Sequence, residues 1–129
     1  MQITVTMSNV LDFKQTANQF REKTLPLVGA YKLMKISNSI DKEIEFYSTE
    51  FQKVIETYAQ KDENGEYKFS EDGSQILIQP DKVEECNDAL EKLLEMEVVV
   101  DNLDFTINDL GNDIECTPEE LENLMPFLK

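Results

Sequence analysis

The sequence predicts an α+β protein with a helical hairpin containing one long helix (about 28–60), a small, mainly antiparallel sheet with a β-hairpin, a third helix and a short C-terminal helix. Three observations carry this prediction. The first half of the chain holds a long apolar stripe with helical spacing, short β-branched and aromatic runs flank turn residues, and a helix-start motif precedes the C-terminus. The length of 129 residues predicts one domain, 1–129.

The N-terminal segment predicts a strand and then a helix. Apolar and polar residues alternate over residues 2–6, as in a short strand. Ser8 is placed to cap a helix over about residues 9–23. The buried face of this helix would hold Val10, Phe13, Ala17 and Phe20. Because the residue before a proline disfavours the helical conformation, Pro26 predicts a connection that leads to an antiparallel neighbour.

The long helix is predicted from one continuous apolar stripe. Its members follow one another at spacings of three or four residues, which keeps them on one helix face: Leu33, Ile36, Ile40, Ile44, Tyr47, Phe51, Ile55 and Tyr58. The regular spacing predicts that this face is buried. A helix over residues 28–60 would be roughly 50 Å long, more than a compact domain of this size spans. An overhanging part would therefore be free to meet a partner or a second copy.

A turn and a hairpin follow the long helix. Asn64-Gly65 is a helix stop. The acidic residues beside it resemble the opening of a calcium loop, but Tyr67 and Gly73 stand where an EF-hand needs glycine and a bidentate glutamate. Asp72-Gly73 between residues 67–69 and 76–78 predicts a β-hairpin instead.

The third helix is predicted from a start signal and an apolar face. Asp81 and Glu84 have the spacing of a capping arrangement, and the helix would continue to about Met96. Its buried face would hold Val83, Cys86, Leu90, Leu93 and Leu94.

Two further strands and the last helix complete the chain. Residues 98–100 and 105–107 are strand-like. Thr117 is a helix cap, Pro118 suits the first helical position, and Glu120 completes a capping box, so a short helix begins here.

The inventory of reactive side chains favours a protein that is not an enzyme. The chain has no histidine, no glycine-rich phosphate loop and no Gly-x-Ser-x-Gly turn, so we expect no metal site and no cofactor. Its two cysteines, Cys86 and Cys116, form no Cys-x-x-Cys pair and are expected to be reduced and at least partly buried. A dense carboxylate group of Glu95, Glu97, Asp101 and Asp104 leaves magnesium binding or glycoside hydrolysis as a minor alternative.

No segment resembles a leader or a membrane span. The N-terminus lacks a basic stretch followed by an apolar run, and no apolar run approaches about 18 residues. We therefore expect a cytoplasmic protein without a membrane partner.

The net charge of −15 is concentrated in one half of the sequence. Residues 1–61 hold eight basic and seven acidic side chains, whereas residues 62–129 hold four basic and twenty acidic ones. Such an acidic surface repels nucleic acid and attracts basic protein surfaces, including those that hold nucleic acid. The alternative is that the acidic side chains only maintain solubility.

The candidate partner-binding residues are exposed carboxylates of this acidic half. Those on the outer face of the third helix would form a row opposite its apolar residues, and three from the next segment would extend it: Glu84, Glu85, Asp88, Glu91, Glu95, Asp101, Asp104 and Asp109.

Several stretches resemble a family of small, acidic, uncharacterised proteins of phages and prophages of Gram-positive bacteria. They are Leu25-Pro26-Leu27, Ala30-Tyr31-Lys32-Leu33, Tyr58-Ala59-Gln60-Lys61-Asp62-Glu63-Asn64-Gly65, Leu103-Asp104-Phe105-Thr106-Ile107 with Leu110, Thr117-Pro118-Glu119-Glu120-Leu121 and Leu124-Met125-Pro126. The resemblance spans nearly the whole chain. It implies a phage origin and a role performed by binding, and the family has no assigned catalytic residues to carry over.

Two functions follow as hypotheses. The first is an inhibitor, like an anti-CRISPR protein, that mimics nucleic acid and occupies the phosphate-binding groove of a host defence protein. The second is a virion assembly or accessory protein that acts through its long helix, against itself or a structural protein.

Overall fold

The computed structural model describes residues 1–129 and confirms the α+β fold. The chain divides into two compact units, each described separately below. Unit 1 comprises Met1–Glu45 and Glu95–Lys129, and unit 2 comprises Phe46–Leu94. The length of the chain predicts one domain, in which the two units would unfold together. This stays a prediction.

Unit 1 contains a two-stranded antiparallel sheet. Strand β1 (Gln2–Thr6) pairs with β2 (Glu97–Asp101), with Thr4 opposite Val99. Val5, Val98 and Val100 are buried, whereas Val99 is exposed, because successive side chains of a strand point to opposite faces. The strands predicted at the N-terminus and at residues 98–100 are thus confirmed.

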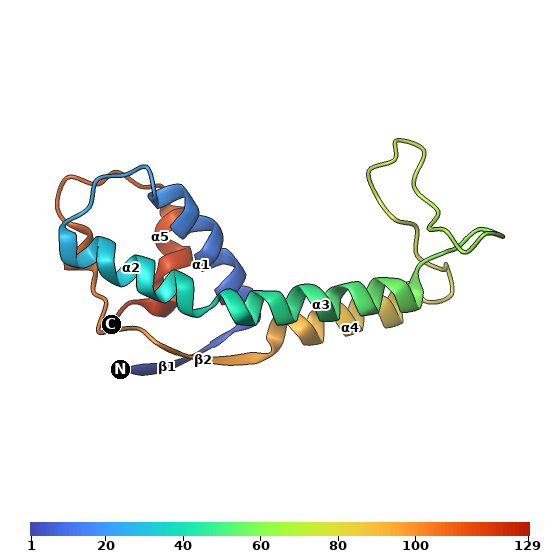
Figure 1. Cartoon of the computed structure of the whole chain (residues 1–129), viewed down its shortest axis with the longest axis horizontal. Coiled ribbons are helices and arrows are strands. Elements are labelled where there is room, and N and C mark those ends of the chain that lie inside the picture. The colour runs from blue at the N-terminus through green and yellow to red at the C-terminus, as the bar shows by residue number, and fades with distance from the viewer. The chain divides into compact units, whose positions relative to one another are not determined.

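Helices α1 (Met7–Phe20) and α2 (Leu27–Ser39) contact this sheet in unit 1, and α5 (Pro118–Leu124) packs against α1 (Figure 1). Helix α1 also contacts α2, and α5 continues into the 3₁₀ turn η2 (Met125–Phe127). The rings of Phe13 and Phe127 stack with centroids 4.2 Å apart. The core is formed mainly by Met7, Val10, Phe13, Phe20, Ile36, Ile40, Phe105, Leu124 and Phe127.

Helix α1 begins earlier than its sequence pattern predicted. Its cap is Thr6, not Ser8: the Thr6 hydroxyl accepts from the backbone N–H of Asn9, and the Asn9 side chain accepts from the backbone N–H of Thr6. The last residue of β1 thus also starts α1, because its extended backbone is the conformation that a cap requires.

The strand expected at residues 105–107 is absent. Leu103 and Asp104 have φ angles of 53° and 55°, so the chain turns sharply and continues into the 3₁₀ helix η1 (Ile107–Leu110). The buried Asn102 amide holds this turn by donating to the carbonyl of Phe127 (3.2 Å). The apolar Phe105 that suggested a strand is a core residue of the connecting segment.

The predicted long helix is bent at Ile40, between α2 and α3 (Asp41–Tyr58). Backbone hydrogen bonds from Ile40 to Ile36 and from Ile44 to Ile40 carry the helix through the bend. The Ser39 hydroxyl donates to the Ile36 carbonyl (2.8 Å) and competes for this acceptor, a local cause of helix bending.

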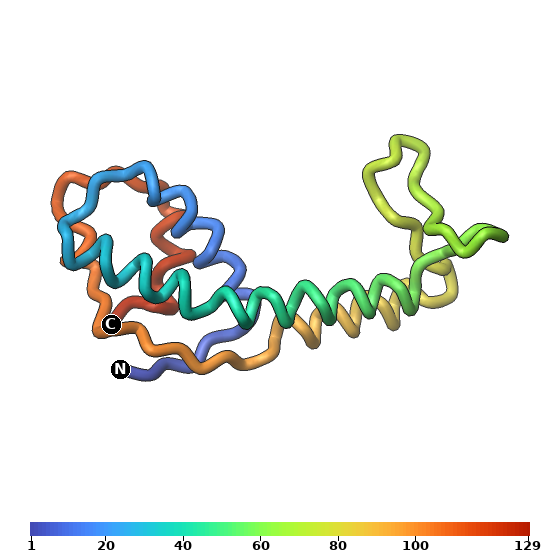
Figure 2. Tube along the Cα trace, in the orientation of Figure 1, coloured from blue at the N-terminus to red at the C-terminus, as the bar shows by residue number.

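Unit 2 is a helical hairpin with an irregular connection (Figure 2). Helix α4 (Val83–Glu95) runs antiparallel to α3. Between them, an antiparallel bridge joins Phe69 to Ile76 and the backbone N–H of Leu77 donates to the Lys68 carbonyl, which confirms the predicted β-hairpin. The predicted cap of α4 is wrong by one residue. The cap position is Lys82, whose carbonyl accepts the first helical hydrogen bond, from the backbone N–H of Cys86, and Asp81 lies one residue before it.

The prediction that the whole stripe is buried is wrong for α3. Leu33, Ile36 and Ile40 are buried, but no residue of α3 is. In unit 2 only Ala59 and Cys86 are buried. Two helices and a hairpin are too few elements to cover an apolar helix face from more than one side. The other cysteine, Cys116, is exposed, contrary to expectation.

Candidate functional site

The candidate site is the outer face of α4. Glu84, Asp88, Glu91 and Glu95 are all exposed and lie four, three and four residues apart, so they form one line along the helix. We call these four side chains the acidic row. Glu85 is also exposed but lies to one side of this line. The structure thus brings together the predicted residues that α4 contributes.

The apolar face of α4 explains why the acidic row points outward. Cys86 is buried, and Leu90, Leu93 and Leu94 are half-buried on the side of the helix roughly opposite the row. Burial of the Cys86 thiol raises its pKa, which keeps it protonated and unreactive.

Part of the acidic row is unfavourable for the helix that carries it, although Glu84, in the first turn, is favourably placed for the helix dipole. Like charges four residues apart, as in Glu84/Asp88 and Glu91/Glu95, each cost about 0.2–0.5 kcal/mol of helix stability. Glu95 also stands at the C-terminal end of α4, where the helix dipole disfavours negative charge. Because a local conflict of this kind is expected mainly at functional sites, the row is a candidate for binding.

No basic side chain lies within salt-bridge distance of the acidic row, although Lys92 stands on the same helix, four residues after Asp88. Glu85 pairs with Lys82 at 3.5 Å, but none of the four row carboxylates forms a salt bridge. At about 1.5 Å per residue, the row carries one charge per roughly 5.5 Å of helix axis. A strand of B-DNA carries one per about 3.4 Å, so the row has a somewhat lower charge density of the same sign.

Asp101 and Asp104 already have partners in unit 1. The N-terminal amine lies 3.1 Å from Asp101 and 3.8 Å from Asp104, and Lys129 lies 3.7 Å from Asp104. The backbone N–H of Leu103 donates to Asp101, and this bond, followed by the amine, lowers the pKa of Asp101. Both carboxylates are exposed, but their charges are partly compensated.

Asp109 is a structural residue of unit 1. Its side chain is only 19% exposed and completes a capping box with Thr106, whose backbone N–H donates to it at 2.9 Å. Lys32 of α2 also lies 3.0 Å from this carboxylate. The hydrogen bond from Thr106, then Lys32, lowers the pKa of Asp109. This carboxylate therefore stabilises the contact between α2 and η1.

The uneven charge along the sequence is not a division between the two units. Unit 2 holds twelve acidic and five basic side chains, a net charge of −7, and unit 1 holds fifteen and seven, a net charge of −8. Within unit 1, the mildly basic residues 1–45 fold together with the strongly acidic residues 95–129. Ion pairs such as Lys32–Asp109 are the result. Unpaired acidic charge is therefore clearest on α4.

No group of three or more acidic or cysteine side chains is arranged to hold a metal ion. No helix is long and apolar enough to cross a membrane.

A second surface, on α2, was missed by sequence reasoning. Leu27, Val28, Tyr31 and Met34 are between 52% and 85% exposed and lie on the side of α2 away from the core. We call these four residues the α2 apolar face. The signal was present in the sequence, because α2 is apolar on both sides and only one of the two sides can face the core.

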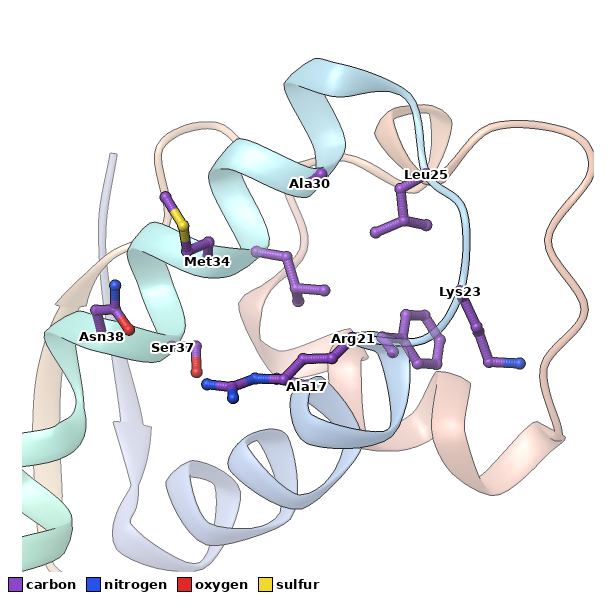
Figure 3. A pocket seen from close by; sticks show the side chains of 10 residues that line it. Ala17, Arg21, Lys23, Leu25, Ala30, Met34, Ser37 and Asn38 are labelled. Atoms are coloured by element: carbon purple, nitrogen blue, oxygen red, sulfur yellow. The ribbon is translucent and has the colours of Figure 1, made fainter.

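A pocket of about 450 Å³ adjoins this face, between α1, α2 and their connection (Figure 3). Its apolar lining includes Phe20, Leu33 and Met34, and Arg21 and Lys23 add positive charge. Lys23 donates to the carbonyl of Glu115 and lies over the Phe20 ring. Arg21, the single arginine of the chain, has no ion-pair partner.

No curated protein and no solved structure matches this chain. A family model does match it, over residues 4–123. This match covers both units and every residue of the candidate site. The chain therefore belongs to the family described as "Protein of unknown function (DUF1617)".

Proposed function

We propose that this protein is a non-enzymatic, phage-encoded binding module that inhibits a host nucleic-acid-binding defence protein. The acidic row of α4 would occupy the basic groove in which that target holds DNA or RNA. The complex would form in the cytoplasm of the host cell. The protein would bind neither nucleic acid nor membranes directly, since its charge repels both.

The observation that carries this proposal is the unpaired acidic row. Four exposed carboxylates on one helix lie in a line and none of them forms a salt bridge, although like charges four residues apart destabilise the helix. Because the helix backbone is already formed, only the side chains of the row have to be ordered on binding, which limits the entropic cost of association. Asp101 and Asp104 would contribute less, because the N-terminal amine and Lys129 compete for them.

The experiment compares three baits in quantitative pull-downs from host lysate, followed by DNA competition with the captured protein. The test variant is Asp88→Lys/Glu91→Lys/Glu95→Lys. The control is Asp113→Lys/Glu119→Lys/Glu122→Lys, which makes the same change of net charge at exposed acids of unit 1 that have no salt bridge. We expect one basic partner to be retained by the wild type and the control and lost by the test variant.

The captured partner should also release a labelled DNA duplex when the wild-type protein is added. Binding should weaken as salt rises past about 0.15 M, because the contact is electrostatic. A partner that binds all three baits equally and is insensitive to salt would refute the proposal.

A second candidate function is virion assembly, and the exposed α2 apolar face favours it. Apolar patches of this kind on a single chain commonly mark protein interfaces. In that case the partner of the pull-down would be lost on substitution of Tyr31 and Met34 rather than of the acidic row.

A further inference from the structure

We propose that the pocket beside the α2 apolar face binds the unit 2 hairpin of a second copy of this chain, with the Phe69 side chain as anchor. Copies would thereby associate head to tail. This inference does not depend on the proposed function, because the acidic row takes no part in the contact.

The pocket is suited to an apolar group that carries negative charge beside it. Its volume of about 450 Å³ is within the range of pockets that bind organic groups, about 300–1,000 Å³. Its lining is apolar except at the edge, where Arg21 extends from the end of α1 toward Ser37 and Asn38 of α2 (Figure 3). A guanidinium without an ion-pair partner is a good recognition group for a carboxylate.

The hairpin offers the complementary chemistry. Phe69 is 54% exposed, although large aromatic side chains are usually buried. Glu71 and Asp72 follow it within three residues, and both are exposed. The hairpin thus presents an aromatic side chain with carboxylates next to it.

The charges of the two segments are opposite. Residues 21–40 hold four basic side chains and one acidic one, whereas residues 62–81 hold one basic and six acidic ones. The formal charges of +3 and −5 are opposite in sign, and they remain so when Lys32, which pairs with Asp109, is left out, although both copies have a net charge of −15. A second copy is therefore the partner that we choose for the pocket, because its own residues 62–81 supply the complementary acidic segment.

The hairpin is ordered before it binds. The Asp72 carboxylate accepts hydrogen bonds from the hydroxyls of Ser70 and Ser74 and from the backbone N–H of Ser74. Gly73, with a φ of 73°, permits the turn. Because the turn is already fixed, less conformational entropy is lost when Phe69 enters a pocket.

The pocket and the hairpin are different surfaces, so the contact is heterologous. Each copy would use its pocket for one neighbour and its hairpin for another, which forms closed rings or open chains. A contact made by one anchor and one or two charge pairs is small, so we expect it to be weak.

The test measures the mass of the full-length protein by analytical ultracentrifugation between about 1 μM and about 1 mM, in about 0.15 M salt to screen the repulsion of net charge. We expect the average mass to rise with concentration. Phe69→Ser should weaken association at least tenfold, and so should Arg21→Glu/Met34→Glu. The matched controls are Val99→Ser, an exposed apolar residue of β2, and Lys42→Glu, an exposed base of α3, and both should associate like the wild type.

Mixing the two defective variants gives the decisive result. The Phe69→Ser protein retains a pocket and the Arg21→Glu/Met34→Glu protein retains a hairpin, so together they should restore association between unlike copies. The proposal is overturned if the wild type stays monomeric, if either defective variant associates normally, or if the mixture fails to associate. Normal association of both variants would indicate another surface, such as the half-buried stripe of α3.

Discussion

Gly29 lies where α2 meets the backbone of η1. A Cβ atom at this position would be 1.8 Å from the Asp109 carbonyl oxygen, so a side chain cannot fit unless the backbone moves. We expect Gly29→Ala to lower the free energy of unfolding by more than about 3 kcal/mol, above the usual cost of overpacking. Urea unfolding followed by circular dichroism would measure this.

Gly73→Ala is the matched comparison. A Cβ atom at this position would have no neighbour within 4 Å, and only the φ of 73° disfavours alanine. The substitution should cost about 1–2 kcal/mol. An equal effect of both substitutions would show that Gly29 is not needed for close packing.

Asp109 predicts a pH dependence of stability. Its pKa is lowered by Thr106 and Lys32, so its stabilisation is present above the unfolded pKa of about 3.9 and is lost as pH falls. Asp109→Asn should cost about 1–3 kcal/mol at pH 7, the range for hydrogen bonds to charged groups. The difference from wild type should shrink below about pH 4.

Urea unfolding of the full-length protein at several pH values would measure this difference. Asp113→Asn, at an exposed carboxylate without a salt bridge, is the control and should show no such dependence. A difference that stays constant down to pH 3 would show that the Asp109 charge does not stabilise the fold.

Local signals in the sequence were reliable where a few neighbouring residues decide the structure. The capping box of Thr117, Pro118 and Glu120 starts α5 as predicted. The cap of α1 was misplaced because Thr6 also belongs to β1, and the dual role depends on pairing with a strand about ninety residues away. For the same reason the pairing of Asp109 with Lys32 could not be foreseen, since Lys32 is distant in the sequence.

At the scale of elements, periodicity predicted the helices but not how deeply each is buried. The stripe continues without a break from Ile36 to Phe51, at spacings of three or four residues, yet Ile36 is buried and Phe51 is half-buried. Spacing shows which residues share a face, whereas burial depends on how many layers cover that face. The exposure of the outer face of α4 was predicted correctly, because a helix with acidic side chains on one face and apolar side chains on the other can only turn its apolar face inward.

This difference within the stripe can be measured. Ile36→Ala should lower the free energy of unfolding by about 2–5 kcal/mol, because its side chain is fully buried. Replacement of a buried phenylalanine by alanine typically costs about 3–5 kcal/mol. Phe51→Ala should cost less, because Phe51 is only half-buried and its removal leaves a smaller cavity. If Phe51→Ala is the more destabilising of the two, the apolar face of α3 must be covered in solution, as a self-associating long helix would require.

At the scale of the whole molecule, the two units differ in how much core they possess. Fifteen of the seventeen buried apolar side chains belong to unit 1, and unit 2 contributes only Ala59 and Cys86. Local stability follows the number of buried apolar contacts, so unit 2 should open more readily than unit 1.

Native-state hydrogen exchange by mass spectrometry can test this expectation. Amides of α4 should exchange at least tenfold faster than those of α1 and β2, because opening unit 2 exposes little buried apolar surface. A variant that destabilises unit 1, such as Ile36→Ala, should accelerate exchange in α1 more than in α4. Equal protection of α1 and α4 in the wild type, falling together in this variant, would show that the two units unfold as the single domain that the chain length predicts.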